Sequence, residues 1–134
     1  MGVSYNIRDS GRIVYATYTG TIDLTQITAM WQDYMNDPAF QMDRPHLVDL
    51  AQVTETEVGF SEVFSLFSMF MRHYEQAGLR LYIAINAPRE LTFGLARIFQ
   101  NLAESSDVVE TAIFDDLDSA RQWALAKTEE SPAP

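Results

Sequence analysis

Few residues of this chain combine a reactive or polar side chain with a suitable position, and Asp49, Thr54 and Asn86 are the best placed of them. Asp49 lies in a short apolar segment, Thr54 in the polar segment that follows, and Asn86 at the end of the next apolar segment. If both apolar segments are parallel strands, their ends meet at one sheet edge, where open α/β proteins bind ligands. We therefore predict that these residues contact a ligand. The alternative is that Asp49 caps backbone amides and Asn86 forms a turn.

Arg89 is the basic residue with the most suitable position near that edge. It stands in the first turn of the helix expected after Asn86, where its guanidinium and the helix amides could hold an anion together. An exposed or ion-paired arginine would fit the same position, and this second interpretation stays open.

Catalytic and metal-binding patterns are missing from the sequence. The two histidines, His46 and His73, belong to different predicted elements, and a metal site would need further ligands brought in by the fold. Ser61 and His73 lie on one predicted helix, roughly 18 Å apart by its rise, which excludes a triad with Asp49. The chain has no cysteine. We expect no catalytic residue, no metal and no cofactor.

The formal net charge of the chain is −10 at pH 7. A surface of this sign repels the phosphates of nucleic acids and of anionic membranes. We therefore expect neither of them as a partner.

A stretch from about Val58 to Ala77 is predicted to be a long helix with a broad apolar face. The simplest interpretation is that this face belongs to the core. The alternative is that one edge of it lines a ligand cavity or forms a partner surface, because methionine adapts to varied shapes. The residues of that edge are Phe60, Phe64, Phe67 and Met71.

Length and composition favour a single globular domain. The chain has 134 residues, of which 47% are hydrophobic. No apolar run approaches the roughly 20 residues of a membrane-spanning helix, and the N-terminal residues have no apolar signal core. We expect a cytoplasmic domain over residues 1–127 and a frayed tail over residues 128–134.

Strand-like and helix-like segments alternate along the chain, which predicts a mixed five-stranded α/β sheet with four helices. The expected elements are a hairpin of strands Val3–Arg8 and Arg12–Thr19 ended by Gly20, a helix from Asp23 to Asn36, a strand His46–Leu50, a polar loop Ala51–Glu57, a helix Val58–Ala77, a strand Leu79–Asn86, a helix over Leu91–Leu102, a strand Val108–Phe114 and a last helix after Asp116.

Local signals delimit two of the helices. Asp23 with Gln26 has the spacing of a capping box. Pro38 ends the first helix because it cannot continue one. Gly78 suits a left-handed C-cap after the long helix because it has no Cβ to clash there.

The order of these segments resembles the SpoIIAA-like family of the STAS fold. The residues that carry the resemblance are Gly20 with Asp23, Asp37-Pro38, His46-Leu47-Val48-Asp49-Leu50, Tyr82-Ile83-Ala84-Ile85, Phe93-Gly94-Leu95-Ala96-Arg97 and Ala120-Arg121-Gln122-Trp123. They span nearly the whole chain.

The resemblance also implies where a regulatory phosphoserine would stand. In STAS anti-anti-sigma factors, that serine follows the strand and loop at the start of the next helix. Here the position falls on Val58 or Gly59, and Ser61 comes later, inside the helix. The chain therefore resembles a divergent branch without the phosphoacceptor, for which the family implies a small-ligand, lipid or partner-binding module.

We therefore expect a non-catalytic binding or regulatory module. Its ligand would be small, apolar or lipid-like, with a polar head near Asp49 and Asn86 and an apolar wall along the aromatic edge of the long helix. A protein partner and a homodimer are further expectations. The alternative function is a phosphorylation-dependent regulator of the anti-anti-sigma type, and the third is an enzyme of unknown reaction.

Overall fold

The computed structural model of the protein describes residues 2–130. Strands and helices alternate after an opening pair of strands. The elements are β1 (Gly2–Arg8), β2 (Ile13–Ile22), α1 (Leu24–Met35), β3 (His46–Thr56), α2 (Phe60–Ala77), β4 (Leu81–Asn86), α3 (Glu90–Glu104), β5 (Val109–Phe114) and α4 (Leu117–Glu130).

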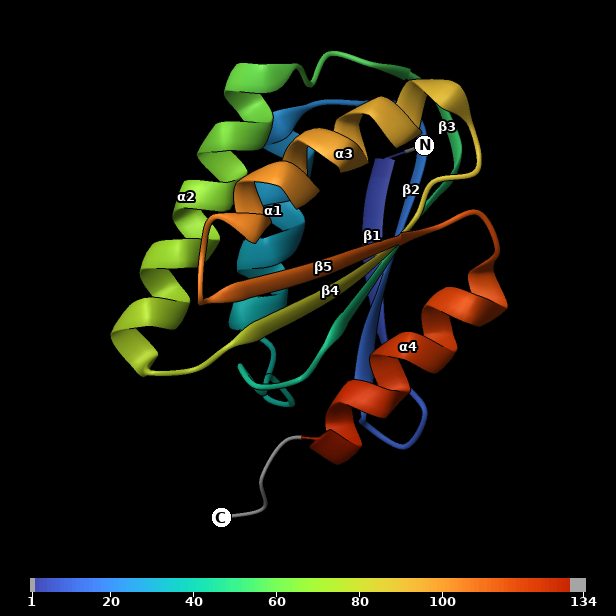
Figure 1. The fold of residues 1–134 in the computed structure, drawn as a ribbon. Coiled ribbons are helices and arrows are strands. Elements are labelled where there is room, and N and C mark those ends of the chain that lie inside the picture. The colour runs from blue at the N-terminus through green and yellow to red at the C-terminus, as the bar shows by residue number, and fades with distance from the viewer. Residues whose placement is uncertain (1, 131–134) are drawn as a thin grey trace.

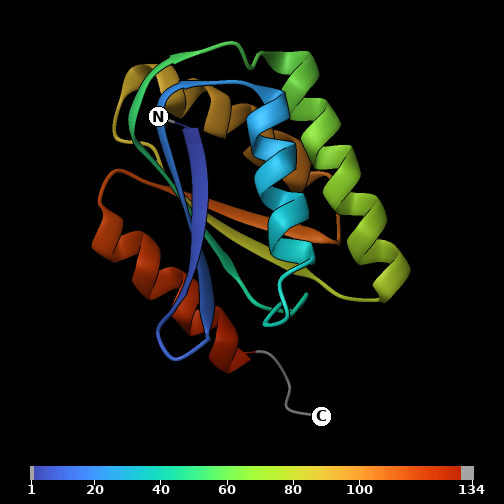
Figure 2. The same ribbon diagram turned by 180° about the vertical axis from the view of Figure 1, so that it is seen from behind.

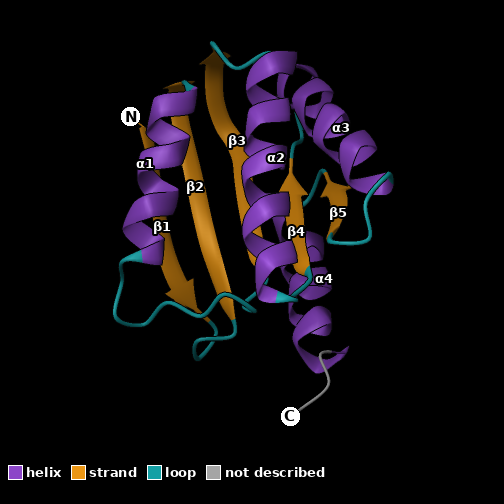
Figure 3. Cartoon of the chain, turned by 90° about the vertical axis from the view of Figure 1, so that its left-hand side faces the viewer, coloured by secondary structure: helices purple, strands orange, loops and turns teal. Residues whose placement is uncertain are grey.

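The strands form one sheet in the order β1-β2-β3-β4-β5. β1 is antiparallel to β2, and the other neighbouring strands are parallel. α1, α2 and α3 lie on one face of this sheet and α4 lies on the other (Figures 1 and 3). The mixed five-stranded sheet with four helices that the sequence predicts is therefore confirmed.

The β1–β2 hairpin turns through residues with left-handed backbone conformations. The φ angles are 58° for both Asp9 and Ser10 and 84° for Gly11. Such angles cost free energy outside glycine and persist where other contacts hold them. The Asp9 carboxylate supplies one such contact, an ion pair of 2.6 Å with Arg121 of α4. Figure 2 shows the hairpin turn beside α4.

β3 is longer than the sequence predicts. It extends to Thr56, so the polar loop expected over Ala51–Glu57 is wrong for most of its length. β2 likewise continues past Gly20 to Ile22. The register between β2 and β3 shifts twice, so β3 contains extra residues at these bulges. Bulges break the alternation of apolar and polar residues by which a strand is recognised in a sequence. The sequence of Ala51–Glu57 therefore resembles that of a loop.

The predicted helix ends are confirmed by their hydrogen bonds. In the capping box of α1, the Gln26 N–H donates to Asp23 Oδ1 at 2.8 Å and the Asp23 N–H donates to Gln26 Oε1 at 3.3 Å. α2 begins after Gly59, whose N–H donates to Glu62 Oε1 at 2.7 Å. It ends at Gly78, whose φ of 70° is left-handed.

Two cores lie on the two faces of the sheet. The larger one packs α1, α2 and α3 against the strands and includes Trp31, Tyr34 and Tyr74, whose side chains are fully buried. The smaller one packs α4 against the strands through Ala120 and Ala124. Small residues at these two positions let the α4 backbone lie close to the sheet. The central strands are therefore buried on both faces.

No helix within residues 2–130 is long and apolar enough to cross a bilayer. The last helix continues to Glu130, beyond the predicted end of the domain at residue 127. The remainder of the predicted tail, residues 131–134, lies outside the described residues.

Replacement of two glycines by alanine should have opposite effects on stability. Gly78→Ala should lower the free energy of unfolding by about 1 kcal/mol, because Gly78 has a φ of 70°. Gly94→Ala is the matched control, since Gly94 lies inside α3 and a Cβ atom added there would meet open space. It should raise the free energy of unfolding by roughly 0.5–1 kcal/mol. Urea denaturation measures both, and equal effects would contradict the assignment of the α2 C-cap.

Candidate functional site

Asp49 and Asn86 lie side by side on neighbouring strands. The register places Thr17, Asp49, Asn86 and Phe114 in one row across β2, β3, β4 and β5. Asn86 Nδ2 donates a hydrogen bond to Asp49 Oδ1 at 3.0 Å. The sequence predicted this proximity, but it placed Asp49 at a strand end, and β3 continues past Asp49 to Thr56. Ligand binding by the pair stays a prediction.

The Asp49 carboxylate has a hydrogen-bond donor on each of its oxygens. Besides Asn86, the N–H of Ala51 donates to Oδ1 at 3.1 Å, and the Tyr15 hydroxyl donates to Oδ2 at 3.3 Å. Burial, and next the Asp49 charge, raise the pKa of Tyr15. Asn86 Oδ1 is buried and has no hydrogen-bond partner among the described residues. The hydrogen bonds of this cluster thus join β2, β3 and β4, and Asn86 Oδ1 remains as an acceptor without a partner among the described residues.

This cluster of Tyr15, Asp49 and Asn86 lies on the α4 face of the sheet. Tyr15 packs into the same core as Ala120 of α4, and the sheet register together with the alternation of side chains puts Asp49 and Asn86 on the same face. α2 lies on the opposite face (Figure 1). The sheet therefore separates the predicted polar contacts from the predicted apolar wall.

Thr54 and Arg89 lie near the ends of β3 and β4. Thr54 is exposed on the extended part of β3, at its second register shift. Arg89 is exposed at the N-cap of α3, and its Nη1 donates to the carbonyl oxygen of Val53 at 3.3 Å. This hydrogen bond fastens the start of α3 to β3, and an anion at Arg89 stays a prediction.

The four residues of the predicted aromatic edge of α2 differ in burial. Phe60 is 61% and Phe64 43% exposed, and their rings stack with centroids 6.3 Å apart. Phe67 is buried and packs edge-to-face on Phe99 of α3 at 5.9 Å. Met71 is partly buried. The edge therefore begins on the surface and enters the core toward the middle of α2.

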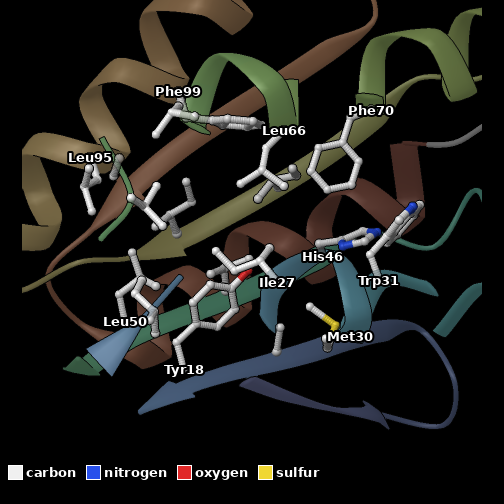
Figure 4. A pocket seen from close by; sticks show the side chains of 18 residues that line it. Tyr18, Ile27, Met30, Trp31, His46, Leu50, Leu66, Phe70, Leu95 and Phe99 are labelled. Carbon is white, nitrogen blue, oxygen red and sulfur yellow. The ribbon is translucent and has the colours of Figure 1, made fainter. Parts of the chain in front are cut away.

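An apolar cavity of about 110 Å³ lies between the sheet and the helices α1, α2 and α3. Figure 4 shows the side chains around it. α2 contributes residues of a neighbouring helical face, not those of the predicted edge. The lining residues are Ala16, Tyr18, Ile22, Ile27, Met30, Trp31, His46, Val48, Leu50, Val58, Val63, Leu66, Phe70, Ile83, Ile85, Leu95, Ala96 and Phe99.

The floor of this cavity is the row Ala16, Val48 and Ile85 on β2, β3 and β4. Val48 stands on the central strand, where covering helices normally bury a side chain fully, yet it is only partly buried. Ala16 beside it is small. The helices α1 and α2 therefore leave space above the middle of the sheet.

Two nitrogen-bearing rings, Trp31 and His46, lie at one end of the cavity (Figure 4), with ring centroids 5.4 Å apart. Trp31 Nε1 and His46 Nε2 are buried and have no hydrogen-bond partner among the described residues. Burial, and next the Arg44 charge, lower the pKa of His46 from 6.5 to about 3. The imidazole is neutral near pH 7, so no charged side chain lines the cavity.

The lining residues Tyr18, Trp31 and His46 were not predicted as site residues. Trp31 lies inside the helix predicted from Asp23 to Asn36, and His46 begins the predicted strand His46–Leu50. A polar atom at a core-facing position is the signal that marks all three. The sequence cannot show which of these atoms lack a partner, because that depends on contacts between distant segments.

No group of three or more His, Asp or Glu side chains within the described residues is arranged to hold a metal ion.

A comparison with solved structures finds similarity to an uncharacterised protein of the DUF3478 family from Shewanella loihica PV-4, which has a SpoIIAA-like fold. The TM-score is 0.59 at 15% sequence identity, and the match covers 92% of this chain and 93% of that one. At this identity the similarity concerns the fold, so the SpoIIAA-like fold predicted from the sequence is confirmed. No family model and no curated protein matches the chain.

Replacement of two phenylalanines on α2 by alanine should lower the free energy of unfolding by unequal amounts. Phe67→Ala should lower the free energy of unfolding by about 3–5 kcal/mol, because it removes a buried ring from the core. Phe64→Ala should cost about 1 kcal/mol or less, since Phe64 is 43% exposed. Chemical denaturation of both variants measures the difference, and a loss at Phe64 as large as that at Phe67 would refute its surface position.

His46 should make stability depend on pH. The pKa of His46 is about 3 in the folded protein against an ordinary value of 6.5. Below pH 6.5 the unfolded chain takes up a proton that the folded protein does not, so the free energy of unfolding falls as pH falls toward 3. Between pH 7.5 and pH 4.5 the wild type should lose roughly 2–3 kcal/mol more than His46→Leu. Parallel curves for the two proteins in urea titrations would show that His46 is not buried as a neutral group.

Proposed function

We propose that the protein is a non-catalytic ligand-binding module that holds a small apolar molecule in the cavity between the sheet and α1, α2 and α3. The observation that carries this proposal is the cavity of about 110 Å³ with its almost wholly apolar lining. Protein interiors are close-packed and leave few voids larger than a water molecule. Enclosed apolar cavities stay dry and take up small apolar molecules, and this partly open cavity offers them the same kind of lining.

The cavity volume limits the size of the ligand. An engineered cavity of about 150 Å³ in another protein accommodates benzene, so a volume of about 110 Å³ suits a molecule of similar or slightly smaller size. A longer, lipid-like molecule would have to displace side chains that are only partly buried. Met30, Leu66, Phe70 and Leu95 are the partly buried helical residues of the lining.

The chemistry of the lining supports binding without catalysis. His46 has a pKa of about 3, far below the pH of the cell, and is therefore a weak base. The lining contains no carboxylate, amine or guanidinium side chain. The Asp49 carboxylate, on the opposite face, is engaged by three hydrogen bonds.

A second candidate function is the binding of a protein partner at the start of α2. The stacked rings of Phe60 and Phe64 favour it, since they are 61% and 43% exposed. Aromatic side chains often anchor protein–protein interfaces. This surface and the cavity involve different residues, so substitutions separate the two functions.

Narrowing the cavity should weaken ligand binding without harming the fold. Benzene at about ten times its Kd should raise the unfolding midpoint of the wild type by roughly 4–6 °C, because a ligand that binds the folded state stabilises it. Val48→Leu should reduce this shift and leave the ligand-free midpoint unchanged or higher, since the added methylene takes up part of the open space.

Val53→Leu is the matched control for this substitution. Val53 lies on the same strand and is fully buried, but it does not line the cavity. The extra methylene should therefore overpack the core and cost about 1–3 kcal/mol, while the benzene shift persists. A similar loss of stability for both variants, together with no shift in the wild type, would contradict the proposed function.

A further inference from the structure

The hydroxyl of Tyr18 is the one oxygen that the lining side chains bring to the cavity. The remaining lining residues are aliphatic, aromatic or nitrogen-bearing, apart from the sulfur of Met30. In Figure 4 the Tyr18 oxygen points in among the lining side chains. Tyr18 as a whole is 8% exposed, so little of its side chain is accessible to solvent.

This hydroxyl makes no hydrogen bond with any residue that the structure describes. Two other buried tyrosines differ from it: the Tyr15 hydroxyl donates to Asp49, and the Tyr34 hydroxyl donates to the carbonyl oxygen of Gln41 at 3.1 Å. Burial alone raises the pKa of Tyr18, in keeping with the lack of a polar neighbour. Buried hydroxyls normally have a partner, so this one is suited to bind a polar atom of a ligand.

Tyr74 has a buried hydroxyl without a described partner as well, but it does not line the cavity. The same distinction separates Tyr18 from Asn86, whose free oxygen lies on the opposite face of the sheet. Tyr18 is therefore the position at which an unpartnered oxygen and a cavity coincide.

The rest of the lining restricts the chemistry of the ligand. No charged side chain lines the cavity, so a charged head would be buried without a counter-ion, which is costly. A phenol hydroxyl can donate a hydrogen bond, and the indole N–H of Trp31 can only donate. Donors without partners favour a ligand that carries an acceptor.

We propose that the Tyr18 hydroxyl is the polar anchor of the cavity and that the natural ligand is a small uncharged molecule with one hydrogen-bond acceptor, such as a carbonyl oxygen. This inference rests on the ligand-binding function proposed above. It adds the class of ligand and the residue that selects it.

Two probes of equal size test the role of the hydroxyl. Cyclopentanone carries a carbonyl, and methylenecyclopentane replaces its oxygen by a CH₂ group. Their Kd values are measured by NMR titration on the wild type and on Tyr18→Phe, which keeps the ring and removes the hydroxyl. The Kd of cyclopentanone should rise roughly three- to tenfold in the variant. The Kd of methylenecyclopentane should stay within about twofold, because it has no acceptor to lose.

Tyr15→Phe is the control for the loss of a tyrosine hydroxyl elsewhere. Tyr15 lies on the α4 face and its hydroxyl bonds to Asp49, so the Kd values of both probes should match those of the wild type. The ligand-free unfolding midpoints give a second readout. Tyr18→Phe should melt at the wild-type temperature or above it, since it removes a hydroxyl without a native partner, whereas Tyr15→Phe should melt lower.

The outcomes separate this inference from the proposed function. If both probes bind and Tyr18→Phe leaves both Kd values unchanged, the anchor is refuted and the ligand-binding function stands. If neither probe binds the wild type, the anchor is refuted, and if benzene does not bind either, the ligand-binding function is refuted with it. A midpoint of Tyr18→Phe several degrees below that of the wild type would reveal a native partner of the hydroxyl and overturn the inference.

Discussion

Side chains of the central strands alternate between two buried faces, and the positions of all functional groups depend on this alternation. Ala16, Val48 and Ile85 point to the side of α1, α2 and α3, where they form the cavity floor. Asp49 and Asn86, one position further along their strands, point to α4. A step of one residue along a strand therefore leads from the apolar cavity to the polar cluster, because successive side chains in a strand point to opposite faces.

Large rings at one end of the cavity keep the helices from closing over the sheet. Trp31 of α1 meets Phe70 of α2 edge-to-face with centroids 5.0 Å apart, and His46 of β3 lies beside both rings. Rings packed in this way cannot be compressed, so they act as a spacer between α1 and α2. Above Val48, where the lining side chains are smaller, the space remains open.

Buried charges are kept away from the cavity. Arg44 is 6% exposed and donates hydrogen bonds to the carbonyl oxygens of Gly11 and Ala39 and to the Tyr34 hydroxyl. Asp49 is engaged on the opposite face of the sheet. A buried charge is tolerated where hydrogen bonds replace water, and both groups meet this condition. The cavity is left with neutral polar atoms, which suit an uncharged ligand.

Local chemistry by itself determined the order of the elements, the capping box of Asp23 and the left-handed end of α2 at Gly78, because each depends on neighbours in the chain. The sequence also predicted that Asp49 and Asn86 are neighbours on parallel strands, although Asp49 lies within β3 and not at its end. Only the tertiary structure decided the length of β3, whose bulges respond to pairing with β2. The exposure of Phe64 and the cavity also depend on how helices pack across the sheet. The spacing of apolar residues shows which face of a helix a residue belongs to, but distant segments decide what covers that face.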